Sequence, residues 1–311
     1  MLDATSKAFF ATLAGSATLK KLASKYGMRP GGFARRFIAG ETVAEALDAA
    51  RLIEQSGLAV TLDLLGESVS STAEAATATG AYLSMIGEMK QRGVGRNISI
   101  KLTQLGLGVD QATCFDNLRR VLDAAAKVDF FVRIDMENSP YTDRTLDTFE
   151  TLWKMNYRNV GVVIQSCLRR SELDVRRVNA LGARVRLVKG AYRELSDVAL
   201  QRKSEVDAAY IAQMRLLLTD GTHPAFGTHD PAMIDATKAF AAERGIAKDK
   251  FEFQMLYGIR RDLQTQLSSE GYPFRVYVPF GTEWFPYFMR RLGERPANVG
   301  FVAGSIFKEK R

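Results

Sequence analysis

Eight short segments rich in β-branched and aromatic residues recur along the chain, with longer amphipathic stretches between them. They are residues 58–65, 97–104, 130–136, 160–166, 184–190, 223–229, 251–256 and 274–280. Each is nearly continuously apolar in its middle, as is typical of parallel strands covered by helices. The repeat of strand and helix therefore predicts an α/β fold, and a closed (β/α)8 TIM-like barrel rather than an open doubly wound sheet, which usually has fewer strands.

Helix-start signals follow most of these segments. They are Ser70 and Ser71 before Glu74, Asp110, Thr142 with Asp143, Ser171 before Asp174, Asp230 before Pro231, and Thr282 with Glu283. Ahead of the first strand, a Gly-rich break at 27–32 and a Thr42–Glu45 capping box indicate helices. We therefore expect one structural domain, composed of an N-terminal helical arm (1–57) and a barrel domain (58–311).

Composition narrows the class of protein. Hydrophobic residues make up 46% of the chain and charged residues 25%, as in an ordinary globular domain. No apolar run approaches the roughly 20 residues that span a bilayer. The two cysteines, Cys114 and Cys167, form neither a disulfide framework nor a metal-ligand cluster. These features predict a cytoplasmic protein in a reducing compartment.

The net charge of +8 raises the question of a nucleic-acid partner. Basic residues occur as scattered pairs, such as Lys20-Lys21 and Arg119-Arg120, without a basic stripe or interleaved aromatic residues. We interpret most of them as solvated helix faces and expect no nucleic-acid binding. Attraction to anionic ligands or to an anionic membrane surface stays open.

Polar side chains collect where the predicted strands end. They are Asp63, Lys101, Asp135, Gln165, Arg186, Lys189, Tyr192, Thr228, His229, Asp230, Gln254, Tyr257 and Tyr277. In a (β/α)8 barrel the C-terminal strand ends converge on one mouth. A hydrogen bond within a loop explains any one of these residues equally well. Together, several cations among carboxylates predict a site for an anion and for proton transfer.

Arg290 and Arg291 follow the aromatic run 284–288 in the last predicted helix. Adjacent helical residues point about 100° apart, so both reach one ligand group only if it lies at the helix's inner edge. The usual explanation of such a pair is a solvated face. The neighbouring aromatic residues favour a ligand, and a guanidinium is well shaped to bind a carboxylate.

The sequence matches neither a dinucleotide-binding fingerprint nor a metal-ligand cluster. Gly93 and Gly95 precede a strand, whereas a dinucleotide fingerprint follows one and opens a helix, so we expect no nicotinamide site. His223 and His229 lie at opposite ends of one predicted strand without a Cys or carboxylate cluster beside them. We therefore expect no catalytic metal.

Four segments carry a family resemblance: FRVYVPFGTEWFPYFMRRLGERPANVG (274–300), RVRLVKGAY (184–192), SIKLTQLG (99–106) and RIDME (133–137). Through them the chain resembles the monofunctional bacterial proline dehydrogenases, which are (β/α)8-barrel flavoenzymes. The resemblance implies FAD-dependent oxidation of L-proline to 1-pyrroline-5-carboxylate, with a hydride passing to flavin N5 and electrons to a quinone. It thus implies the first step of proline catabolism to glutamate, with pyrroline-5-carboxylate dehydrogenase as a further partner.

The resemblance also implies residue roles. It implies catalytic roles for Lys101, Asp135 and Arg186, with Arg186 near flavin N5. Substrate contacts are Lys101, Leu256, Tyr277 and Tyr287, with Arg290 and Arg291 on the carboxylate. Cofactor contacts are Met136, Gln165, Arg186, Lys189, Gly190, Ala191, Tyr192, Thr228, His229 and Glu294. The chain departs from the family at Phe280 and Phe285, where tyrosine is frequent, and at Gly293, where alanine is common.

Two other functions fit the residues read on their own. Schiff-base aldolase barrels also place a lysine at a strand end, and Lys101 or Lys189 could form the imine. A non-catalytic, membrane-associated barrel is the second alternative. For the dehydrogenase, a membrane quinone as acceptor implies peripheral association with the inner membrane.

Overall fold

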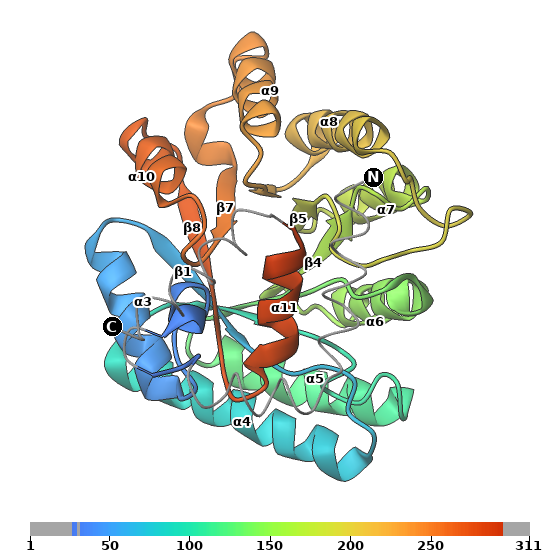
Figure 1. Ribbon diagram of the computed structural model, residues 1–311. Coiled ribbons are helices and arrows are strands. Elements are labelled where there is room, and N and C mark those ends of the chain that lie inside the picture. The colour runs from blue at the N-terminus through green and yellow to red at the C-terminus, as the bar shows by residue number, and fades with distance from the viewer. Residues whose placement is uncertain (1–26, 30–31, 295–311) are drawn as a thin grey trace.

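Eight parallel strands close into a barrel in the order of the sequence (Figure 1). This computed structural model describes residues 27–29 and 32–294. The strands are β1 Ala59–Leu64, β2 Asn97–Ile100, β3 Phe131–Ile134, β4 Val160–Gln165, β5 Val185–Val188, β6 Ala225–Gly227, β7 Glu252–Leu256 and β8 Phe274–Phe280. Pairing of β1 with β8, from Ala59 with Arg275 to Leu64 with Phe280, closes the barrel. The predicted (β/α)8 fold is confirmed.

A ring of helices surrounds the strands (Figure 1). It contains α4 Thr72–Arg92, α5 Gln111–Ala126, α6 Thr142–Lys154, α7 Ser171–Ala180, α8 Lys203–Asp220, α9 Pro231–Glu243 and α10 Arg261–Ser269. Ser71, Asp110 and Asp230 cap α4, α5 and α9 through their side chains, as the sequence predicts. Helix α7 does begin at Ser171, but that hydroxyl donates to the carbonyl of Gln165 at the end of β4 instead of capping the helix.

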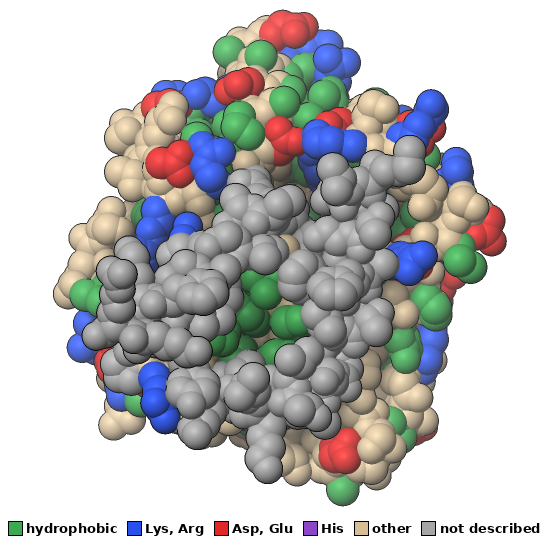
Figure 2. All heavy atoms as spheres, in the orientation of Figure 1, with side chains coloured by type: hydrophobic (Ala, Val, Ile, Leu, Met, Phe, Trp, Pro, Cys, Tyr) green, Lys and Arg blue, Asp and Glu red, His purple; other side chains and the backbone are tan. Residues whose placement is uncertain are grey.

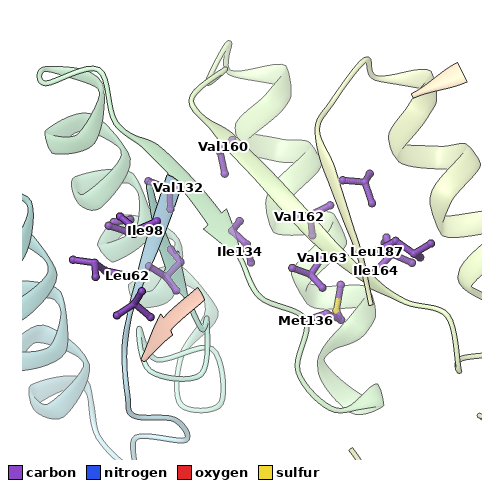
Figure 3. Close-up of a cluster of buried hydrophobic side chains, with 14 of the residues drawn as sticks. Leu62, Ile98, Val132, Ile134, Met136, Val160, Val162, Val163, Ile164 and Leu187 are labelled. Carbon is purple, nitrogen blue, oxygen red and sulfur yellow. The ribbon is translucent and has the colours of Figure 1, made fainter. Parts of the chain in front are cut away.

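Alternate strand residues form an apolar layer between the strands and the helices. Figure 3 shows part of it, with Leu62, Ile98 and Val132 contributed by three successive strands. All three side chains are fully buried in the main core cluster. Because side chains alternate along a strand, the residues between them face the inside of the barrel.

The inside of the barrel is polar. Arg186 on β5 donates to the hydroxyl of Ser99 on β2 over 3.2 Å, although these two strands are not neighbours. Farther from the mouth, Arg275 donates to Glu252 over 3.1 Å. TIM barrels usually fill this space with branched apolar side chains. Burying charges is costly even when they are paired, so this interior indicates a functional constraint rather than a stabilising one.

The last helix, α11 (Trp284–Glu294), lies across the barrel mouth instead of joining the outer ring (Figure 1). Figure 2 shows apolar side chains at the centre of the same view, where α11 lies. The ring of Phe288 on α11 packs 5.2 Å from that of Phe33 in the short helix η1 (Phe33–Arg36). The Trp284 indole donates to Glu41 over 3.0 Å, just before α3 (Val43–Gln55).

The segment that precedes the barrel therefore supports the helix at its mouth. The capping box between Thr42 and Glu45 is present at the start of α3. Residues 1–26 of the predicted helical arm lie outside the described residues, so the boundary at residue 57 stays a prediction. None of the described helices has an apolar stretch long enough to cross a lipid bilayer.

Gly258 allows the loop after β7 to approach this N-terminal segment. Its φ is +73°, and a Cβ there would lie 1.7 Å from the carbonyl oxygen of Arg36. Gly258→Ala should lower the free energy of unfolding by about 2–5 kcal/mol, because backbone strain and a steric overlap add. Gly245→Ala is the control: its φ is +64°, but nothing lies within 4 Å of the added Cβ. Denaturant unfolding measures both variants. Equal decreases in the free energy of unfolding for Gly258→Ala and Gly245→Ala would contradict the close approach of Gly258 to Arg36.

Candidate active site

A cavity of about 390 Å³ opens at the C-terminal ends of the strands, beneath α11. It is lined by Asp63, Lys101, Asp135, Met136, Val163, Gln165, Arg186, Val188, Lys189, Gly190, Ala191, Tyr192, Gly227, Thr228, His229, Asp230, Gln254, Met255, Leu256, Tyr277, Tyr287, Arg290 and Arg291. Every residue to which the resemblance gives a catalytic, substrate or cofactor role is in this lining except Glu294, whose side chain lies outside the described part of the chain. Tyr257, which the strand-end pattern also placed at the mouth, is not in the lining; the guanidinium of Arg261 lies 5.7 Å from its ring.

Asp135, immediately after β3, is the hydrogen-bonding centre of this cavity. Its two oxygens accept from Arg186 on β5 over 2.8 Å and from the Tyr277 hydroxyl on β8 over 2.7 Å. The Arg186 guanidinium also lies 5.3 Å from the centre of the Tyr277 ring. Burial and the negative charge of Asp135 raise the pKa of Tyr277 well above its usual value. The phenol therefore stays protonated and donates, which holds Asp135 as an acceptor.

Lys101, after β2, lies between two carboxylates. Its Nζ is 3.0 Å from Asp63 and 3.9 Å from Asp135. Burial alone would lower the pKa of Lys101, but Asp63 and Asp135 outweigh that effect and raise it above its usual value. Burial raises the pKa of Asp63, and the charge of Lys101 offsets part of that rise. Of the two carboxylates, Asp63 is the nearer partner of Lys101.

The other wall of the cavity comes from α11. Tyr287, Arg290 and Arg291 are spaced i, i+3 and i+4, which places them on one face of a helix. Arg290 donates to Glu67 over 3.0 Å, and the Arg291 guanidinium lies 4.9 Å from the centre of the Tyr287 ring. Burial lowers the pKa of Arg290, but Glu67 outweighs it, so the net shift is upward and the guanidinium stays charged.

Backbone groups hold two polar side chains at the ends of β4 and β6. Gln165 donates through Nε2 to the carbonyl of Glu137 over 2.8 Å, which leaves its oxygen as an acceptor. His229 accepts the amide N–H of Leu256 at Nε2 over 2.9 Å. Nε2 of the imidazole is therefore the acceptor in this contact.

The loop after β5 contributes Lys189 and Gly190. Lys189 binds Asp207 on α8 and, over 2.7 Å, Asp230 at the start of α9. At Gly190 the φ is +111°, and a Cβ would lie 2.4 Å from the sulfur of Cys167. The backbone at Gly190 therefore requires glycine, because a side chain would collide with the neighbouring loop.

Six polar residues of this site have no role in the sequence-based prediction. Asp63, Asp230 and Gln254 appear there only as strand-end residues, and Ser99, Glu67 and Glu137 are not singled out. Ser99 alternates with Lys101 on the inward side of β2, so strand periodicity could have identified it. Glu67 lies in a loop and meets Arg290 across 223 residues of sequence, a contact that no local pattern reveals.

Comparison with known proteins agrees with this arrangement. A family model described as proline dehydrogenase matches residues 46–304. Proline dehydrogenase 2 of Bacillus subtilis is 40% identical over 97% of this chain and 98% of its own length. Proline dehydrogenase of Deinococcus radiodurans is 40% identical over 88% of this chain and 90% of its own. These matches cover nearly the whole of both chains.

Longer proteins contain a similar region. The bifunctional protein PutA of Escherichia coli is 30% identical over 86% of this chain, which spans 24% of its length. The crystal structure of proline utilization A from Bdellovibrio bacteriovorus inactivated by N-propargylglycine has a TM-score of 0.78 and 28% identity, covering 84% of this chain and 32% of that one. The fold, the site and the full-length matches agree: the chain belongs to the proline dehydrogenase family.

Proposed function

We propose that this protein oxidises L-proline to 1-pyrroline-5-carboxylate, the first step of proline catabolism to glutamate, with FAD as its cofactor. One observation carries the proposal. A single cavity brings two arginines on α11 together with a charged and hydrogen-bonded set at the strand ends. The family membership of the chain supports proline as the substrate.

The residues of the cavity fit a flavin. A flat heteroaromatic ring with polar edges needs apolar walls, which Met136, Val163, Val188, Met255 and Leu256 supply. Arg186 Nε and Gln254 Oε1 are buried and have no hydrogen-bond partner within the described residues. The Gln165 oxygen adds an acceptor, and His229 lines the same cavity. We infer that these groups, with Lys189, Gly190, Ala191, Tyr192, Thr228 and Glu294, hold FAD, which when bound supplies a hydride acceptor at N5.

Arg290 and Arg291 would bind the proline carboxylate. Charge-assisted, bidentate hydrogen bonds make arginine the best partner for that group. Among the described residues, the Arg290 guanidinium makes one hydrogen bond, from Nη1 to Glu67, so its remaining N–H groups can bind a ligand. Tyr287 shares the inner face of α11 with both arginines, and Tyr277 and Leu256 line the same cavity, so a ring held by its carboxylate would lie among these side chains.

Hydride loss from the carbon beside nitrogen requires a free lone pair on that nitrogen, so the proline ammonium must first lose a proton. Asp63, Asp135, Lys101 and Tyr277 form a set of hydrogen bonds and ion pairs at the cavity wall. Asp63 Oδ2 is buried without a hydrogen-bond partner within the described residues. Such a set can take up a proton and return it to solvent as the oxidised product leaves.

Arg186 supplies a fixed positive charge at the bottom of the cavity. It is 5% exposed and is held by Asp135 and Ser99. A cation held in this way costs no reorganisation when negative charge develops beside it during hydride transfer. We therefore assign Arg186 an electronic role toward the flavin, and Asp135 the role of fixing its position.

The lysine environments argue against the aldolase alternative. An imine-forming lysine needs a lowered pKa so that its free amine is present at neutral pH. Asp63 and Asp135 outweigh burial and raise the pKa of Lys101, and Lys189 is bound to Asp207 and Asp230. The charged cavity likewise disfavours a non-catalytic scaffold, because charges buried without a function are costly.

The electron acceptor is a further part of the proposal. The sequence contains no dinucleotide fingerprint after a strand, which favours a membrane quinone over a nicotinamide. A net charge of +8 would favour peripheral contact with an anionic membrane surface. PutA relatives are named bifunctional proteins, which supports 1-pyrroline-5-carboxylate dehydrogenase as the partner that takes the product.

Replacing either arginine of α11 should weaken proline binding. Each lost charge-assisted hydrogen bond is worth about 1.5–3 kcal/mol, so Arg290→Ala and Arg291→Ala should each raise KM for proline roughly tenfold to hundredfold. Flavin content should be unchanged. Steady-state kinetics with an artificial electron acceptor measure this. The control is Arg176→Ala, an exposed residue on α7 paired with Glu172; near-normal KM values in both α11 variants would refute the carboxylate clamp.

Replacing Arg186 should affect the rate of oxidation more than binding. Arg186→Met keeps the length of the side chain and removes the charge, so we expect the limiting rate of anaerobic flavin reduction by proline to fall by at least tenfold. Arg186→Lys should recover part of that rate, because it keeps the charge but loses the planar donor. Stopped-flow absorbance at saturating proline gives the rate. An unchanged rate in Arg186→Met at full flavin occupancy would exclude the electronic role.

A further inference from the structure

Glu137 is a buried carboxylate beside the cavity that the proposed chemistry does not use. It is 3% exposed and follows Asp135 by two residues. Its side chain accepts the backbone N–H of Thr103 over 3.0 Å and also the Thr103 hydroxyl. Burial raises the pKa of Glu137, and these two donors offset part of that rise. Glu137 has no cation as a hydrogen-bond partner in the described structure, which is unusual for a carboxylate this deeply buried.

Thr103, the partner of Glu137, also forms hydrogen bonds with the loop after β1. Its hydroxyl accepts the backbone N–H of Ser68 over 2.9 Å, and its carbonyl accepts that of Val69 over 3.3 Å. The Thr103 hydroxyl thus donates to Glu137 and accepts from Ser68, which uses both of its functions. These bonds tie the loop at residues 66–70 to the end of β3.

The tie acts at a strained point of the backbone. Ser68 has a φ of +57°, a left-handed conformation that is unfavourable for a residue other than glycine. Such a conformation persists only where the surroundings determine it. The preceding residue, Glu67, is the partner of Arg290 across the cavity mouth. The backbone conformation of Ser68 therefore helps to fix the position of the Glu67 Cα, from which its side chain extends toward Arg290.

We propose that Glu137 is a positioning residue for the substrate-binding arginine: acting through Thr103, it holds the 66–70 loop so that Glu67 orients Arg290 before proline arrives. The inference rests on the proposed function of Arg290. Glu137 and Thr103 are absent from the residues lining the cavity. Their effect reaches Arg290 through the hydrogen bonds of the Thr103 hydroxyl and of backbone amides, and through the ion pair of Glu67.

Thr103→Val is the direct test, since it removes the hydroxyl while nearly preserving shape. If Arg290 loses its orientation, it must be ordered again when proline binds, which should raise KM for proline about three- to tenfold. The limiting rate of flavin reduction should stay within about twofold and flavin content should not change. Thr103→Ser restores the hydroxyl and should return KM to near the wild-type value. Glu137→Gln, which keeps an acceptor but adds a competing donor, should raise KM in the same direction.

The control is Thr237→Val on α9. Thr237 is also fully buried, but its hydroxyl donates to the carbonyl of Met233 in its own helix over 2.7 Å. It should leave KM unchanged. An unchanged KM in both Thr103→Val and Glu137→Gln would overturn the proposal, as would a failure of Thr103→Ser to restore it. If Thr103→Val lowered the limiting rate of flavin reduction by as large a factor as it raised KM, the proposal would also be overturned, because the variant would then cause a general structural defect.

A double-mutant cycle tests the route of the effect. In a Glu67→Gln background, Thr103→Val should add little to KM, because the ion pair through which it acts is already weakened. Fully additive effects would contradict action through Glu67. Hydrogen exchange of the 66–70 backbone, faster in Thr103→Val than in wild type, tests the tie without turnover. A wild-type protein that fails to oxidise proline would overturn the proposed function, whereas unchanged exchange would overturn the tie itself.

Discussion

The hydrogen bonds of Asp135 are the interactions on which the site depends. This carboxylate joins β5 to β8 through Arg186 and Tyr277 and lies 3.9 Å from the ammonium group of Lys101. A charge inside a barrel is tolerated only when its partners are fixed. The closed barrel fixes the partners of Asp135, because each of them extends from a different strand whose register is set by its neighbours. Removing Asp135 would leave Arg186 buried near the positive charge of Lys101.

The second constraint is the position of α11. A helix in the outer ring would present its arginines to solvent, as the usual explanation of an Arg-Arg pair assumes. Here the helix crosses the mouth and packs on the segment that precedes the barrel, through Phe33, Phe37 and Glu41. Because of this placement, Arg290 and Arg291 face the cavity. The binding side of the site thus depends on contacts between the two ends of the described chain, and the catalytic side depends on the barrel.

The fold could be predicted from the sequence because it follows from periodicity. Strand positions follow from apolar runs, and in a barrel each strand end points to one mouth, so periodicity also places Lys101, Asp135 and Arg186 at that mouth. The roles of these residues come from the family resemblance, not from spacing. The spacing of Tyr287, Arg290 and Arg291 likewise indicates a shared helix face. Glu67, Glu137 and the pairing of Lys101 with Asp63 were missed, because they depend on loop conformation and on distances across the barrel that no spacing encodes. The crossing of α11 over the mouth was missed for the same reason.

The most direct test of the account is the absorbance spectrum of the purified protein before and after anaerobic addition of L-proline. We expect the purified protein to contain flavin, whose oxidised absorbance band is lost when proline is added and returns when an electron acceptor follows. A protein without flavin, or a flavin band that proline leaves unchanged at full occupancy, would contradict it. Trapping of a carbonyl substrate on Lys101 or Lys189 by borohydride would then favour imine chemistry in the same cavity.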